Sequence, residues 1–136
     1  QTTWADQTLK HLLPFISEMD FYRLYLVTNG TASVQKSRLQ SSGIQPYFQG
    51  IFISEDLGAD KPSAAYFDAC FARIPDFQKE ETVIVGDSLT SDIKGGVNAG
   101  IRTIWFHPSS AANETRIQPD YELHALKDLP QLLARI

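Results

Sequence analysis

Short hydrophobic runs alternate with amphipathic segments along this chain. Four runs are rich in β-branched and aromatic residues and are bounded by turn-forming residues: residues 24–28, 51–54, 83–86 and 103–106. Within each run the hydrophobic residues are nearly continuous, which is typical of strands covered on both faces, as in a parallel sheet. We therefore expect these runs to be the buried strands of a mostly parallel sheet.

The segments between the runs have helical spacing. Phe67, Cys70, Phe71 and Ile74 recur on one face and predict a buried helix between residues 63 and 74. Further helices are expected at residues 33–42 with Gly43 as the stop, after Thr90 as far as Gly100, at residues 126–135, and around Pro14, which should kink or divide the N-terminal one. Alternating strands and helices predict an α/β fold in one domain, residues 1–136.

Composition narrows the classes of function. The 136 residues include 12 basic and 16 acidic side chains without a basic cluster, so neither nucleic acid nor an anionic membrane is an expected partner. A single cysteine excludes an internal disulfide framework and a multi-thiolate zinc site. Because there is neither a signal peptide nor an apolar run approaching the roughly 20 residues of a membrane span, we expect a cytoplasmic protein.

A polar motif, Thr28-Asn29-Gly30, follows the first predicted strand. Ligands of open α/β sheets bind outside the carboxyl ends of the strands, so this position is a candidate site. A hydroxyl, an amide and an accessible backbone can converge on the oxygens of a phosphate. Asn-Gly is also a common turn pair, and taken alone the motif favours a turn.

Two carboxylates, Asp87 and Asp92, follow the strand that ends at Gly86. Oxygen ligands of this kind suit Mg²⁺. Helix capping is the simpler explanation for Asp92, but it accounts poorly for an acidic residue directly after a buried strand, so Asp87 favours a site. Lys61, fixed by the following Pro62, could offer its ammonium to a phosphate, although most lysines are merely solvated.

The order of these motifs along the chain resembles the haloacid dehalogenase superfamily, whose members are mostly Mg²⁺-dependent phosphatases. Thr28-Asn29-Gly30, Lys61-Pro62 and Gly86-Asp87 with Asp92 match its second, third and fourth motifs, and the likeness runs from about Pro14 to the C-terminus. Its sequence most resembles the nucleotidase-like and phosphoglycolate-phosphatase-like branches of the superfamily. The resemblance implies a Rossmann-like, three-layer core. It also implies hydrolysis of a small phosphorylated metabolite, a phosphate monoester, through an aspartyl-phosphate intermediate.

The resemblance also implies roles for individual residues. Thr28 would hydrogen-bond the transferring phosphoryl group, assisted by Asn29 and the Gly30 backbone. Lys61 would neutralise the charge of phosphate and nucleophile. Asp87 would ligate Mg²⁺, and Asp92 would orient Lys61 or the water shell of the metal.

One motif of that family is missing from this chain. Its first motif, Asp-x-Asp, supplies the nucleophile from a central strand between those ending here at Thr28 and Gly86, and no Asp-x-Asp occurs in the sequence. The helical cap that follows this strand in the family is missing too. We therefore expect the C-terminal part of a longer phosphatase, inactive alone. Two alternatives stay open: a relative without the nucleophile that binds phosphate or a protein partner, or a second protomer that supplies the strand.

Overall fold

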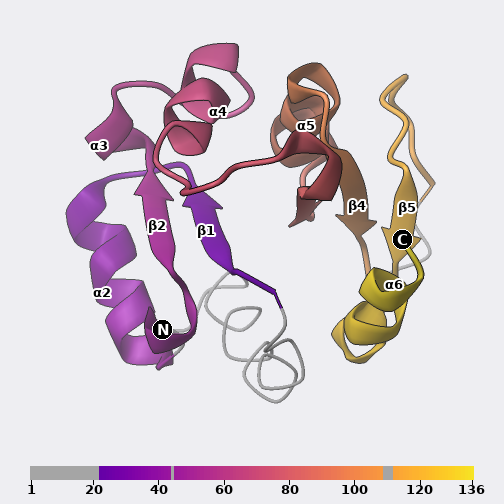
Figure 1. Ribbon diagram of the computed structural model, residues 1–136, viewed down its shortest axis with the longest axis horizontal. Coiled ribbons are helices and arrows are strands. Elements are labelled where there is room, and N and C mark those ends of the chain that lie inside the picture. Colours follow the sequence, from indigo (N-terminus) through magenta and orange to yellow (C-terminus); the bar gives the residue numbers. More distant parts are fainter. Residues whose placement is uncertain (1–21, 44, 109–111) are drawn as a thin grey trace.

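The strands form two separate parallel sheets in the computed structural model, which describes residues 22–43, 45–108 and 112–136. One sheet holds β1 (Tyr25–Thr28) and β2 (Gly50–Ile53), and the other holds β3 (Val83–Gly86), β4 (Arg102–Phe106) and β5 (Tyr121–Leu123) in that order (Figure 1). Every pairing in both sheets is parallel. The four predicted strands are confirmed to within a residue, and the short segment at residues 121–123 adds the fifth.

The helices are α2 (Ala32–Ser42), α3 (Ser54–Leu57), α4 (Ala64–Phe71), α5 (Lys94–Ala99) and α6 (Leu129–Arg135). Gly43 and Gly100 end α2 and α5 in the left-handed conformation, as the sequence predicts. The helix expected between residues 63 and 74 is shorter at its C-terminal end, and Ser63 caps it by accepting a hydrogen bond from the Tyr66 amide. The helix expected around Pro14 lies outside the described residues. Among those that are described, no helix is long and apolar enough to cross a membrane.

Successive side chains of a strand point to opposite faces, so each sheet face can carry an apolar cluster. Helices cover both faces, and the strands lie between two helical layers. On one face Leu26 and Ile104 pack in a cluster with Leu39 of α2 and Leu129 of α6. On the other face the cluster contains Phe52 and Ile84 of the strands and Phe67 of α4. Figure 1 shows α4 and α5 next to each other in the upper part of the view, with α2 at the left and α6 at the lower right. This arrangement confirms the α/β, Rossmann-like class.

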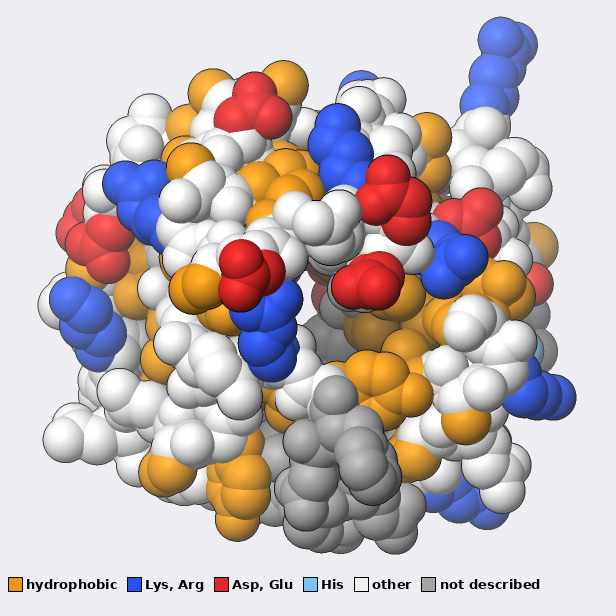
Figure 2. Space-filling model, viewed as in Figure 1, with side chains coloured by type: hydrophobic (Ala, Val, Ile, Leu, Met, Phe, Trp, Pro, Cys, Tyr) orange, Lys and Arg blue, Asp and Glu red, His pale blue; other side chains and the backbone are white. Residues whose placement is uncertain are grey.

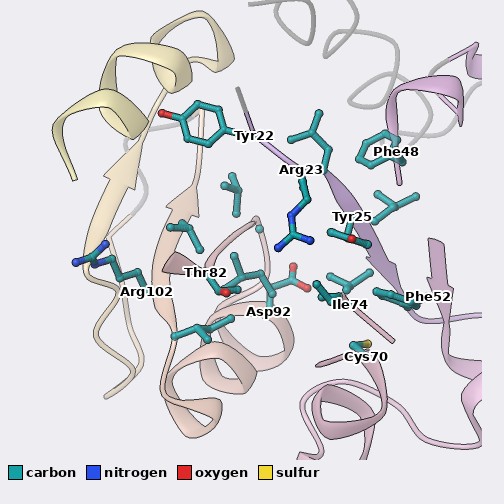
Figure 3. A pocket seen from close by; sticks show the side chains of 18 of the residues that line it. Tyr22, Arg23, Tyr25, Phe48, Phe52, Cys70, Ile74, Thr82, Asp92 and Arg102 are labelled. Atoms are coloured by element: carbon teal, nitrogen blue, oxygen red, sulfur yellow. The ribbon is translucent and has the colours of Figure 1, made fainter. Parts of the chain in front are cut away.

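A cleft of about 820 Å³ separates the two sheets. Its walls include β1 and β3, which do not pair with each other in the described structure. Figure 3 shows Tyr25 and Phe52 on one side of this space and Thr82 and Arg102 on the other, with Asp92 between them. Val85 of β3 is 37% exposed, although it belongs to a strand of the interior. The cleft lies where the sequence analysis expects an additional strand.

Candidate functional site

Lys61 connects the ends of β1 and β3 at the polar edge of the cleft. Its Nζ lies 2.5 Å from Oδ1 of Asp92 and donates to the carbonyl of Val27 at 3.3 Å. The Lys61 and Asp92 side chains are only 10% and 9% exposed. Figure 2 shows a hollow in this face of the molecule, with acidic and basic side chains gathered along its edge. A buried ion pair thus joins the second sheet to the first beside the cleft.

Asn29 holds the backbone of Lys61 from the loop after β1. Its Oδ1 accepts from the Lys61 amide at 2.9 Å, and its Nδ2 donates to the Lys61 carbonyl at 3.3 Å. Asn29 is predicted to assist phosphate binding, and in the structure its side chain is engaged with Lys61. This geometry therefore gives Asn29 the role of fixing the position of the Lys61 backbone.

Ser54 braces the same loop from the end of β2. Its buried hydroxyl accepts from the Gly30 amide at 2.9 Å and donates to the Gly30 carbonyl at 3.3 Å. The Gly30 amide, expected to face a ligand, is therefore bonded within the protein. Thr28 is half-buried and donates its hydroxyl to the Asn29 carbonyl at 3.2 Å. Ser54 is not among the residues predicted for the site, although its place at the carboxyl end of a strand was a usable signal.

Tyr66 supports the end of β1 from α4. Its phenol is completely buried, accepts from the Thr28 amide at 3.1 Å and donates to the Phe52 carbonyl at 2.7 Å. Burial, chiefly, raises the pKa of this phenol far above its usual value, so it stays protonated and can keep donating. Tyr66 thus joins β1 to β2 beside Thr28. Its position on an apolar helix face gave no sequence signal for this role.

Removing the phenol oxygen should destabilise the fold. Tyr66→Phe leaves the Thr28 amide and the Phe52 carbonyl without this partner in a buried place, which should lower the free energy of unfolding by about 1–3 kcal/mol. Urea unfolding measures the change. Tyr47→Phe is the control, because Tyr47 is 45% exposed, and its effect should stay within about 0.5 kcal/mol. Equal effects of the two substitutions would contradict the bridging role.

Asp92 lies on a π-helical turn, η4 (Leu89–Ile93), which begins directly after Ser88. One carboxylate oxygen of Asp92 meets Lys61, and the other accepts from the Ser88 amide at 3.4 Å. The main chain of Gly86 lies so close to Asp92 that a β-carbon at residue 86 would overlap the Asp92 side chain. Glycine before the acidic residue is therefore what allows Asp92 to turn back toward the lysine.

Gly86→Ala should therefore damage the site rather than only the strand. The added methyl group must displace Asp92, and we expect a loss of about 1–3 kcal/mol in stability together with a weakened Lys61–Asp92 pair. Thermal unfolding and the Asp92 carboxyl signal in a nuclear magnetic resonance titration measure the two effects. The control is Gly58→Ala, because a β-carbon there would meet nothing within 4 Å, although its φ of 70° adds local strain. An unchanged Asp92 signal in Gly86→Ala would show that the close approach is unimportant.

Asp87 faces the solvent at the rim of the cleft. Partial loss of solvent and, second, the negative charge of Asp92 raise the pKa of its carboxyl, while Lys61 acts in the opposite direction. A divalent cation would offset this repulsion, and carboxylate oxygens are ligands that suit Mg²⁺. Within the described ranges no three His, Cys, Asp or Glu side chains gather as metal ligands. Asp87 and Asp92 therefore fit Mg²⁺ only as part of a shell completed by water, substrate or another chain segment.

Cys70 is a core residue. It is 2% exposed within the cluster around Phe67, and burial raises the pKa of its thiol to about 11. The helical spacing predicted a buried Cys70, and burial disfavours the thiolate required of a nucleophile. Gly95 and Gly96 likewise serve close packing, because β-carbons there would overlap Phe67, Ile84 and Thr103.

Comparison with known proteins identifies several relatives of this chain. The family model for haloacid dehalogenase-like hydrolases matches residues 7–106. Pyrimidine 5'-nucleotidase PynA of Streptococcus pneumoniae is 48% identical over 87% of this chain and 49% of its own length. N-acylneuraminate-9-phosphatase of Mus musculus is 34% identical over 98% of this chain and 57% of its own.

A solved structure agrees with the fold. The magnesium-bound crystal structure of the HAD-hydrolase YfnB from Bacillus subtilis superimposes with a TM-score of 0.86 at 46% identity, over 89% of this chain and 54% of that one. The chain thus spans about half the length of the relatives it matches. The family match covers most of the chain and includes the segments bearing Thr28, Lys61, Asp87 and Asp92. This chain belongs to the haloacid dehalogenase-like hydrolase family.

Proposed function

We propose that the protein of which this chain is part hydrolyses phosphate monoesters with Mg²⁺. The observation that carries the proposal is the buried Lys61–Asp92 pair, placed between the end of β1 and Asp87 at one edge of the cleft. Relatives named as a nucleotidase and a phosphatase support it. The proposed substrate is a small phosphorylated metabolite of the cytoplasm, with pyrimidine 5'-nucleotides among the first to test.

Lys61 is positioned to bind the phosphate. An ammonium group has three donors, of which one faces Asp92 and another the Val27 carbonyl, so the third can reach a phosphate oxygen. Thr28 can turn its hydroxyl from the Asn29 carbonyl to a second phosphate oxygen. The lysine is held in place by Asn29 and Asp92. Its positive charge then lowers the repulsion between the substrate phosphate and the carboxylate that attacks it.

Asp87, with Asp92 nearby, would hold Mg²⁺ at the rim. When bound, the ion supplies further charge stabilisation for phosphoryl transfer, the dominant contribution to this reaction. Asp87 must be ionised to do so, and its raised pKa means that protons compete with the ion more strongly than at an ordinary carboxylate.

The nucleophile is proposed to be an aspartate on a strand that occupies the cleft between β1 and β3. Its carboxylate forms a bond to phosphorus while the ester P–O bond breaks, and the leaving oxygen takes a proton from a neighbouring acid. Water then cleaves the aspartyl-phosphate and releases inorganic phosphate. The strand would come from a segment outside this sequence or from a second copy, because no Asp-x-Asp occurs here. The chain alone is accordingly expected to be inactive.

Inorganic phosphate release by the whole protein separates a hydrolase from a binding module. The panel contains pyrimidine and purine 5'-nucleotides, sugar phosphates and phosphoglycolate. We expect turnover of at least one class, with the isolated chain of residues 1–136 as the inactive comparison. Saturable binding of inorganic phosphate with no turnover of any ester would instead establish the binding module.

A further inference from the structure

Trp105 contacts the loop that carries Asp87. It lies on β4 opposite Gly86 of β3, and its indole Nε1 donates to the backbone carbonyl of Asp87 at 3.1 Å. The side chain is not a surface residue, since Trp105 is only 6% exposed. An indole has one donor and no acceptor, so this hydrogen bond uses its whole polar capacity.

The indole stacks on His107, which in turn contacts Glu122 of β5 and His124. The Trp105 and His107 rings stack with centroids 3.7 Å apart and planes 17° from parallel. His107 is 8% exposed, and its Nε2 lies 2.9 Å from Oε1 of Glu122. His124 packs edge-on against His107 at 4.4 Å, and its Nδ1 lies 3.1 Å from the His107 carbonyl. A continuous set of contacts thus runs from β5 through β4 to the main chain of Asp87.

We propose that Trp105 is a positioning residue for a cation site at Asp87. The hydrogen bond fixes the Asp87 carbonyl, and therefore the direction in which the exposed carboxylate leaves the backbone at the rim of the cleft. Stacking on His107 limits the rotation of the indole, so the donor stays aimed at that carbonyl. The inference rests on the proposed function only in taking Asp87 as a ligand of Mg²⁺.

The size of the effect follows from how outer partners act in metal sites. Residues that orient a ligand, without touching the ion, commonly change metal affinity by about 10- to 100-fold when replaced. Trp105→Phe keeps an aromatic ring for the stack but removes the N–H donor. We expect it to weaken Mg²⁺ binding by about 10-fold, without removing Asp87 itself.

Thr103→Val is the matched control on the same strand. Thr103 is completely buried on β4, and its hydroxyl accepts from the Asp120 amide at 2.9 Å and donates to Asp120 Oδ2 at 3.3 Å. Valine has nearly the same shape and lacks the hydroxyl. This substitution should reduce stability, but it should leave Mg²⁺ affinity within about twofold because the lost bonds do not reach Asp87.

The experiment measures Mg²⁺ binding to the whole protein by titration calorimetry without substrate, and thermal unfolding in parallel. The proposal predicts binding that Asp87→Asn abolishes, Trp105→Phe weakens about 10-fold and Thr103→Val spares. Wild-type affinity in Trp105→Phe, equal weakening in Thr103→Val, or no effect of Asp87→Asn would each overturn it. If these binding results hold while no phosphate ester is hydrolysed, the positioning role stands and the proposed reaction fails. If esters are hydrolysed but Trp105→Phe binds Mg²⁺ normally, the proposed reaction stands and the positioning role fails.

Discussion

Lys61→Met should lower kcat/KM for phosphate ester hydrolysis by the whole protein about 10²- to 10³-fold, because the substitution removes the cation that lies between the two sheets. It also leaves Asp92 buried without its ion-pair partner, which should cost about 3–5 kcal/mol of stability. Steady-state phosphate release and urea unfolding measure the two effects. Lys36→Met is the control, since Lys36 is exposed and lies 4.0 Å from Asp56 at the surface.

A double substitution separates loss of charge from loss of folding. Lys61→Met with Asp92→Asn removes both charges, so much of the stability lost in Lys61→Met should return. Activity should not return, because the phosphate still lacks its ammonium partner. Recovery of both properties together would mean that Lys61 matters only to the fold.

Asp87→Asn should reduce the rate of phosphate release about 100-fold or more at moderate Mg²⁺ concentration, because an amide is a weaker ligand than a carboxylate. Its effect on stability should have the opposite sign. The folded protein raises the pKa of Asp87, so the ionised carboxylate is less favourable in the folded than in the unfolded chain. Removing that charge should therefore leave the unfolding midpoint of the metal-free protein unchanged or slightly raised.

Asp56→Asn serves as the matched control for this substitution. Asp56 is also a surface carboxylate, and its ion pair with Lys36 has a separation of 4.0 Å between exposed groups, an arrangement that contributes little. Its activity and stability should remain close to those of the wild type. If Asp87→Asn retained full activity at limiting Mg²⁺, Asp87 would not be the metal ligand.

The strands could be predicted because their hydrophobic runs are continuous, and the caps because Gly43 and Gly100 can adopt positive φ. The structure also brings together Lys61 and Asp92, which the motif order alone had related. The direction of the Asn29 side chain toward Lys61 could not be predicted, because a turn motif does not determine its hydrogen-bond partners.

The supporting residues were harder to predict than the site itself. Tyr66 and Trp105 have the hydrophobic character of core positions, and both are buried in the structure. Their polar atoms reach Phe52 and Asp87, 14 and 18 residues away along the chain. Such contacts depend on the packing of α4 on β2 and of β4 on β3, which local sequence patterns do not specify.

Phosphate release before and after removal of divalent cations is the decisive measurement of Mg²⁺-dependent hydrolysis. The whole protein is assayed on the best ester of the panel with Mg²⁺, then with a chelator in excess, then with Mg²⁺ restored. A Mg²⁺-dependent phosphohydrolase that uses Lys61 and Asp87 predicts release in the first state, near-complete loss in the second and recovery in the third. Release that continues undiminished under chelation, or no release from any ester in any state, would contradict the account.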